Sequence, residues 1–128
     1  METPMSEDNT QDHSSQFSLD FARHEGLRVV LPKFNEVQVD IDNDAAYAQY
    51  KAAYSLLSSS YDVIGASERP SRNGGEGRHI TVRFGHALTQ MERIALQAVM
   101  GSDFRREIFS LERLKGGEAI PTLFFEKP

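Results

Sequence analysis

The sequence of 128 residues contains no cysteine. This absence excludes a disulfide-stabilised scaffold and a zinc site with thiolate ligands. No apolar run approaches the roughly 20 residues that a membrane-spanning helix needs, and the N-terminus has no apolar signal-peptide core. We therefore expect an intracellular, cytoplasmic protein that makes no contact with a membrane.

Three catalytic signatures are also missing from the sequence. There is no G-x-x-x-x-G-K-S/T loop, no His-x-His pair and no serine in a nucleophile-elbow context. These absences argue against a Walker-type NTPase, a metal-dependent nicking enzyme with a His-x-His pair, and an α/β-hydrolase. Any chemistry must come from other side chains.

The charge of the chain is unevenly distributed. The net charge is −5, yet residues 69–115 hold nine basic side chains against five acidic ones. Such a basic segment is typical either of phosphate binding or of a solvated charged surface. Residues 1–24 are polar and acidic without periodicity, which predicts a disordered tail followed by a single domain over residues 25–128.

Hydrophobic periodicity and turn residues predict the elements of that domain. In chain order they are strands at 27–31 and 36–42, a helix up to residue 57, strands at 61–67 and 79–84, helices at 88–100 and 102–115, and a strand at 120–126. Thr89 and Glu92 have the spacing of a capping box, and Gly101 ends that helix. From residue 36 the order β-α-β-β-α-(α)-β predicts an α+β, ferredoxin-like or RRM-like antiparallel sheet with its helices on one face.

The apolar positions predict which face of each helix is buried. The first helix should bury Ala46, Tyr50, Ala53 and Leu57. For the second we expect an inner face of Met91, Ile94 or Ala95, and Ala98 or Val99. For the third the apolar stripe comprises Phe104, Ile108, Leu111 and Leu114.

The segment V-D-I-D-N-D places carboxylates at the end of the second predicted strand. Asp40 and Asp42 are two residues apart, so their side chains point to the same face of the strand. A shared divalent cation such as Mg²⁺ or Mn²⁺ would relieve their repulsion. The alternative is that Asp40 is a sheet-edge acid and Asp42 a helix cap, while Asp44 serves the helix N-terminus.

A second motif, G-G-E-G-R-H-I-T-V, leads from a glycine-rich turn into a strand. Ile80, Val82 and Phe84 share one face of that strand, so His79 shares the other face with Thr81 and Arg83. We expect this second face to be polar and turned outward. In the predicted sheet the strands carrying Asp40 and His79 are the two central ones, so the two motifs meet on the helix-free face. An exposed histidine in a simple hairpin is the alternative.

Together the two motifs resemble those of the archaeo-eukaryotic primase (primase–polymerase) superfamily. The core of that family has a D-x-D metal motif, a glycine-rich segment ending in a strand-borne histidine, and a later third acid. The resemblance covers roughly residues 36–126. It implies that Asp40 and Asp42 bind Mg²⁺ or Mn²⁺, that His79 contacts a nucleotide phosphate, and that Asp103 is the third catalytic acid. Asp103 as a helix cap is the alternative.

Several arginines are candidates for binding the phosphates of a nucleotide or a template, because guanidinium groups form bidentate contacts with phosphate. The candidate arginines are Arg69, Arg72, Arg78, Arg105 and Arg106, and they would act together with His79. The last two are alternatively surface residues that pair with Glu107 or Glu112. Of Phe124 and Phe125, one should enter the core, and the other should stack on a base or lie under the N-terminal segment.

These observations predict a small nucleic-acid-processing protein. The resemblance implies metal-dependent nucleotidyl transfer in DNA replication or repair. Its expected partners are a nucleoside triphosphate and single-stranded DNA or RNA, with a replication protein as a further candidate. By the same resemblance, a compact, cysteine-free domain of this kind would suit a phage or plasmid replication protein. The alternative is a non-catalytic ferredoxin-like module that binds nucleic acid or assists replication.

Overall fold

The computed structural model describes residues 20–71 and 75–128. Its elements are β1 (Arg28–Val30), β2 (Glu36–Ile41), α2 (Asp44–Ser58), β3 (Val63–Pro70), β4 (Arg78–Phe84), α3 (Gln90–Val99), α4 (Phe104–Lys115) and β5 (Phe124–Glu126). A further helical segment covers residues 20–25. The predicted α+β class and the order of elements are confirmed. Within the described ranges, no helix has both the length and the apolar character to cross a membrane.

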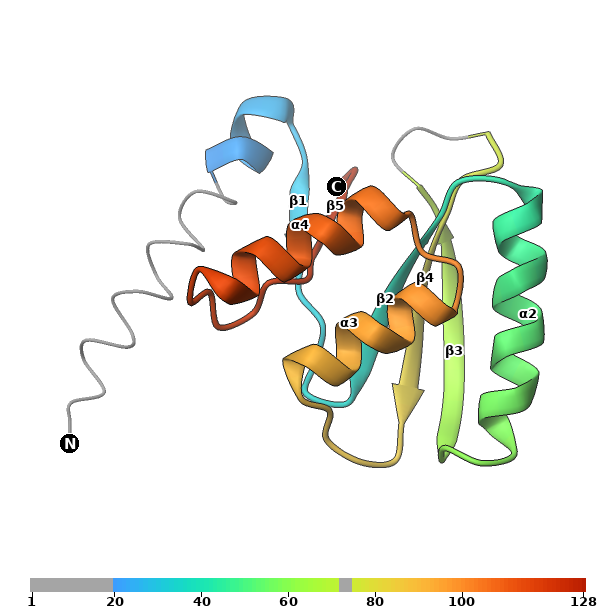
Figure 1. Cartoon of the computed structure of the whole chain (residues 1–128). Helices are drawn as coiled ribbons and strands as arrows, with labels where there is room; N and C mark the ends of the chain where they lie inside the picture. The colour runs from blue at the N-terminus through green and yellow to red at the C-terminus, as the bar shows by residue number, and fades with distance from the viewer. Residues whose placement is uncertain (1–19, 72–74) are drawn as a thin grey trace, which may run out of the picture.

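The main sheet is antiparallel, with strand order β2-β4-β3. Val39 lies opposite Ile80 and Asp40 lies opposite His79, so apolar and polar residues are segregated on the two faces. Helix α2 lies beside β3, and α3 crosses in front of β2 (Figure 1). The apolar face forms the core with Tyr50 and Ala53 of α2, as the helix pattern predicted.

The end strand departs from the predicted arrangement. β5 pairs with β1 in a separate antiparallel ribbon, and β2 is an edge strand of the main sheet rather than a central one. At the free edge of β2, side chains form the hydrogen bonds to the backbone that a neighbouring strand would otherwise form. Gln97 Oε1 accepts from the Gln38 N–H at 2.9 Å, and Arg106 Nη1 donates to the Gln38 carbonyl at 2.7 Å. Because these groups satisfy the backbone of β2, β5 is not needed there.

Capping residues that can be recognised in the sequence mark the ends of α2 and α3. Asn43 caps α2 by accepting from the Ala46 N–H at 2.8 Å. Thr89 and Glu92 form the predicted capping box of α3. Gly101 follows that helix with φ +91°, a backbone conformation that favours glycine.

The N-terminal boundary of the folded part lies before residue 25. Residues 1–19 of the predicted tail lie outside the described residues, whereas residues 20–25 are helical. In that helical segment Ala22 is buried, and the Phe21 ring lies 4.7 Å from the ring of Phe125. Phe124 is buried, whereas Phe125 contacts the N-terminal helical segment. The alternation of the strand predicted that these two rings would point to opposite sides.

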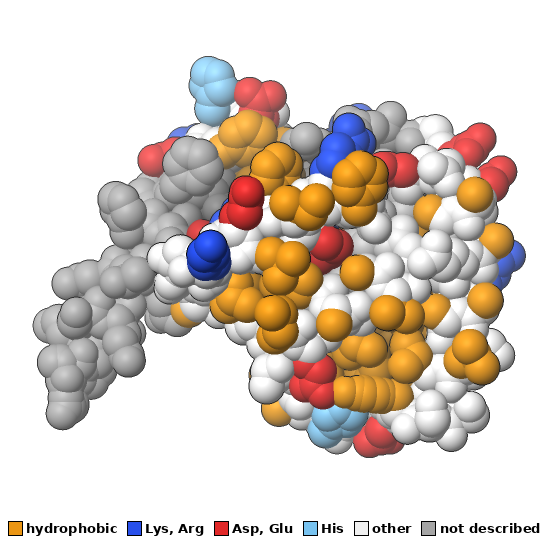
Figure 2. Space-filling view, in the orientation of Figure 1, with side chains coloured by type: hydrophobic (Ala, Val, Ile, Leu, Met, Phe, Trp, Pro, Cys, Tyr) orange, Lys and Arg blue, Asp and Glu red, His pale blue; other side chains and the backbone are white. Residues whose placement is uncertain are grey.

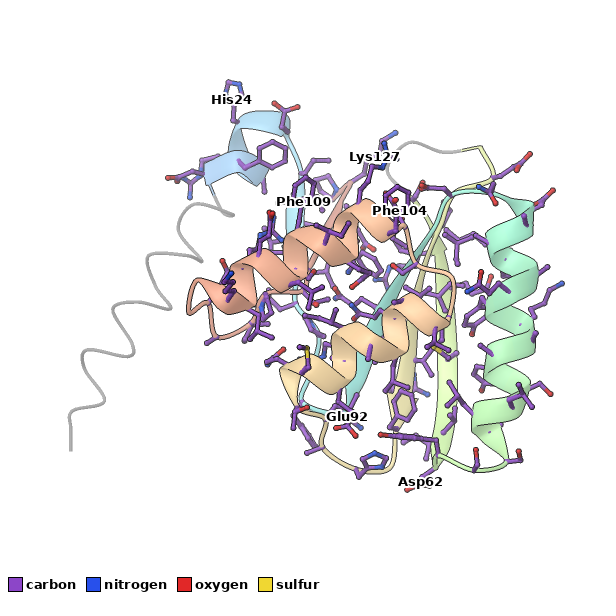
Figure 3. All side chains as sticks on the ribbon, in the orientation of Figure 1. His24, Asp62, Glu92, Phe104, Phe109 and Lys127 are labelled. Atoms are coloured by element: carbon purple, nitrogen blue, oxygen red, sulfur yellow. The ribbon has the colours of Figure 1, made fainter. Side chains whose placement is uncertain are left out.

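The predicted inner faces of α3 and α4 were partly wrong. Met91, Val99, Phe104, Ile108 and Leu111 are exposed, and Figure 2 shows hydrophobic side chains gathered on the face that carries these helices. Figure 3 shows Phe104 and Phe109 projecting away from α4.

These predictions were partly wrong because polar side chains occupy much of the inner side of both helices. Arg93 and Gln97 of α3, and Arg106 and Glu107 of α4, turn inward to bond the edge of β2 and each other. Apolar periodicity alone therefore selected the wrong side of α4.

Candidate metal centre

Three aspartates from two distant parts of the chain meet at the end of β2. Asp40 belongs to β2, Asp42 follows it directly, and Asp103 is the N-cap of α4. One carboxylate oxygen from each residue lies within 4.8 Å of the others. The structure thus brings together the D-x-D pair and the acid predicted as the third member of the site.

The connection between α3 and α4 is fastened to β2 by hydrogen bonds. The Asp103 N–H donates to the Asp40 carbonyl at 2.8 Å, and Ser102 Oγ accepts from the Asp40 N–H at 3.0 Å. The side chain of Asp103 also accepts from the Arg105 N–H at 3.2 Å. Asp103 is therefore both a helix cap and a member of the cluster, because one carboxylate oxygen can cap the helix while the residue stays beside β2.

Burial and mutual repulsion raise the pKa values of two carboxyl groups of the cluster. Burial raises the pKa of Asp40, and Asp42 and Asp103 raise it further, while Arg106 and His79 oppose the rise. Burial and the charge of Asp103 likewise raise the pKa of Asp42, against the effect of Arg105 and His79. Three oxygen donors that repel one another are a donor set suited to a hard divalent cation such as Mg²⁺ or Mn²⁺.

An open pocket of about 550 Å³ adjoins the cluster. Its lining combines two of the carboxylates with cationic and aromatic side chains: Phe21, Asp40, His79, Asp103, Arg105, Arg106, Phe109, Arg113, Leu123, Phe124 and Phe125. Guanidinium groups suit phosphate oxygens, and aromatic rings suit the faces of planar bases. The pocket thus has the lining to take an anionic ligand with a flat ring.

His79 is buried, which corrects the predicted outward face. The β1–β5 ribbon lies across the polar face of the main sheet, and the His79 ring stacks on Phe124 with centroids 3.9 Å apart. His79 Nδ1 lies 2.8 Å from Glu126 Oε2, and His79 Nε2 lies 3.7 Å from Asp40 Oδ1. A polar face can be covered in this way because the covering strand supplies a hydrogen-bonding partner.

Two of the predicted phosphate-binding arginines, Arg69 and Arg78, do not line the pocket. Arg69 donates to both oxygens of Glu126, at 3.1 and 2.9 Å. Arg78 lies on the opposite face of the sheet from His79, with its guanidinium 4.0 Å from the ring centroid of Tyr47. Arg72 lies outside the described residues.

The arginines that do line the pocket come from α4. Arg105 and Arg106, both candidates from the sequence, line it together with Arg113. Arg106 is the least available of the three, because it also bonds Glu107, Gln38 and Leu123 within the protein.

The residues near the site that sequence reasoning missed include Phe109, Arg113 and Glu126. Arg105, Phe109 and Arg113 recur at four-residue spacing, so one face of α4 carried a helical signal that could have identified the first two. Glu126 is a single acid near the C-terminus, and no local pattern pointed to its pairing with His79.

Comparison with known proteins gives no match to a family model, a curated protein or a solved structure.

Proposed function

We propose that the protein is a divalent-metal-dependent nucleotidyltransferase of primase–polymerase type, acting on nucleic acid in DNA replication or repair. The observation that carries this proposal is the convergence of Asp40, Asp42 and Asp103 beside a pocket lined by arginines and aromatic rings. Acidic side chains gather on many protein surfaces. A carboxylate cluster that opens directly into a cationic and aromatic pocket is a more specific combination.

Asp40, Asp42 and Asp103 would hold Mg²⁺ or Mn²⁺ through carboxylate oxygens. When bound, such a cation neutralises triphosphate charge and activates an attacking hydroxyl group. The protein's own contribution is to hold the three carboxylates in place before substrate arrives. The hydrogen bonds of Asp103 and Ser102 to the backbone of Asp40 do this, since they fix α4 against β2.

The pocket gives each part of a nucleoside triphosphate a complementary surface. Arg105 is exposed and lies beside the cluster, with Nη2 3.9 Å from Asp42 Oδ2 and Nε 3.4 Å from Asp103 Oδ1. Its guanidinium can transfer from these carboxylates to phosphate oxygens once a cation occupies the cluster. Phe109 is exposed further along the same face of α4, where it can stack on a base. Single-stranded DNA or RNA is the proposed template.

Nucleotide incorporation tests the proposal. The protein is incubated with Mn²⁺, a labelled nucleoside triphosphate and primed or unprimed single strands, and products are resolved on a gel. We expect extension by wild type and its loss in Asp40→Asn and Asp42→Asn. Asp44→Asn is the matched control, because Asp44 starts α2 outside the cluster.

The same variants decide between catalysis and binding alone. Absence of any product from wild type, together with salt-dependent single-strand binding that survives both substitutions, would contradict the enzymatic proposal. That result would favour the non-catalytic binding module.

A further inference from the structure

A buried charged cluster lies under the β1–β5 ribbon, next to the pocket. Its centre is Glu126, the last residue of β5, whose side chain is 6% exposed. Glu126 accepts hydrogen bonds from Arg69 at 2.9 Å and from Arg28 at 3.3 Å. Its remaining partner is His79, at 2.8 Å. A carboxylate that is almost removed from water is thus surrounded by nitrogen donors.

These contacts determine which nitrogen of His79 carries a proton. Burial alone would raise the pKa of Glu126, but the hydrogen bonds from Arg69 and His79 and the charge of Arg69 outweigh burial and lower it. Glu126 is therefore ionised at neutral pH, and an ionised carboxylate only accepts hydrogen bonds. The short contact to His79 Nδ1 consequently requires a proton on Nδ1.

The ring is fixed in orientation as well as in tautomer. Phe124 and Glu126 are two residues apart on β5, so both point to the same side of the strand. Phe124 covers the face of the His79 ring with an interplanar angle of 1°, and Glu126 holds the Nδ1 edge. The Nε2 edge then faces Asp40 at 3.7 Å, on the side of the pocket.

We propose that Glu126 is a positioning residue for the reaction: it holds His79 with Nδ1 protonated, so that Nε2 is the ring nitrogen presented to the substrate in the pocket. Arg69 in turn holds Glu126 through hydrogen bonds from Nε to both carboxylate oxygens and from Nη2 to Oε2. The catalytic part of this inference rests on the proposed function. The orientation of His79 does not, because it concerns the protein without metal or substrate.

The first experiment is a long-range ¹⁵N–¹H NMR spectrum of the histidine rings in the metal-free protein at neutral pH. The chain has four histidines, and His79→Gln assigns the signals of His79. We expect the pattern of a ring protonated on Nδ1 in wild type. Glu126→Ala should shift His79 towards the tautomer protonated on Nε2, the form preferred when Nδ1 has no acceptor. A wild-type ring with Nδ1 unprotonated would overturn the inference, whichever variants fold.

The second experiment separates positioning from a merely structural role. In the incorporation assay, Glu126→Ala should lower kcat about 10- to 100-fold, because His79 loses the acceptor that orients it. Its Mn²⁺ affinity and its KM should stay within about twofold, because Asp40, Asp42 and Arg105 are untouched. Arg28→Met is the matched control: it removes another partner of Glu126, one whose side chain is 55% exposed, and should leave kcat within about twofold.

The two proposals fail in different ways. Unchanged tautomer and unchanged kcat in Glu126→Ala, with an active wild type, would overturn the positioning role alone. A wild type that binds no Mn²⁺ and makes no product would overturn the proposed function. In that case the NMR spectrum still decides whether Glu126 orients His79.

Discussion

Removing one charge from the aspartate cluster should stabilise the metal-free protein. Asp42→Asn keeps the size of the side chain and removes its repulsion with Asp40 and Asp103, whose nearest oxygens lie within 4.8 Å. At 4.8 Å, two unit charges repel by about 0.9 kcal/mol in water and about 3.5 kcal/mol at an effective dielectric constant of 20.

The lower end of that range applies, because the Asp42 side chain is 49% exposed. The variant also loses an attraction to Arg105, which is itself mostly exposed and therefore contributes little. We expect a net gain of about 1 kcal/mol in the free energy of unfolding. For a domain of this size that gain corresponds to a rise in Tm of about 3–5 °C.

The assay is thermal unfolding followed by circular dichroism, in EDTA and at low salt. Added Mn²⁺ should raise the Tm of wild type more than that of Asp42→Asn, since the variant has lost a ligand. Asp44→Asn should leave Tm unchanged or lower it, because a negative charge in the first turn of α2 favours the helix. If Asp42→Asn melts at or below wild type in EDTA, the carboxylates do not repel in the folded protein and the reasoning is refuted.

The pH dependence of the same difference has a defined sign. Burial, with the neighbouring Asp103, raises the pKa of Asp40 and of Asp42, so the folded protein binds these protons more tightly than the unfolded chain does. The stability that these protons supply is present below the ordinary carboxyl pKa and is lost as pH rises through the raised values. The advantage of Asp42→Asn should therefore shrink as pH falls towards about 4, the ordinary carboxyl pKa.

Three further substitutions test the packing around the site. Gln97→Leu leaves the Gln38 amide of β2 and the Glu107 carboxylate without their shared partner, which is fully buried. It should lower the free energy of unfolding by about 1–3 kcal/mol in urea titration. A smaller loss would show that β2 does not need this hydrogen bond. Gly101→Ala puts a Cβ 2.7 Å from the α2 backbone at φ +91°, and should destabilise more than Gly117→Ala, where φ is +94° with open space around it. Thr89→Ala removes the cap of α3 and should cost about 1 kcal/mol, whereas Thr89→Ser should cost little.

Local features of the fold could be predicted from the sequence because their causes are local. The alternation of apolar residues defined β2 and β4, and the spacing of Thr89 and Glu92 defined the start of α3. The same alternation placed Asp40 and Asp42 on one side of the chain. Asp103 came from the resemblance to the primase–polymerase superfamily, and the structure places it beside them.

The arrangement of the last strand could not be predicted in the same way. Gln97 and Arg106 satisfy the edge of β2 through side-chain atoms, and such partners leave no periodic signal in the sequence. The burial of His79 depends on Phe124 and Glu126, which lie far along the chain and belong to a strand of only three residues. Long-range polar pairing of this kind becomes visible only when the chain is folded.

The central claim is that Asp40, Asp42 and Asp103 together bind a divalent cation. It is tested most directly by Mn²⁺ titration of the ¹⁵N-labelled protein, in which the paramagnetic ion broadens the amide signals of nearby residues. We predict selective broadening of residues 40–42 and 102–105 in wild type, and its loss in Asp40→Asn and Asp42→Asn but not in Asp44→Asn. No selective broadening in wild type, or the same broadening in all three variants, would contradict the claim.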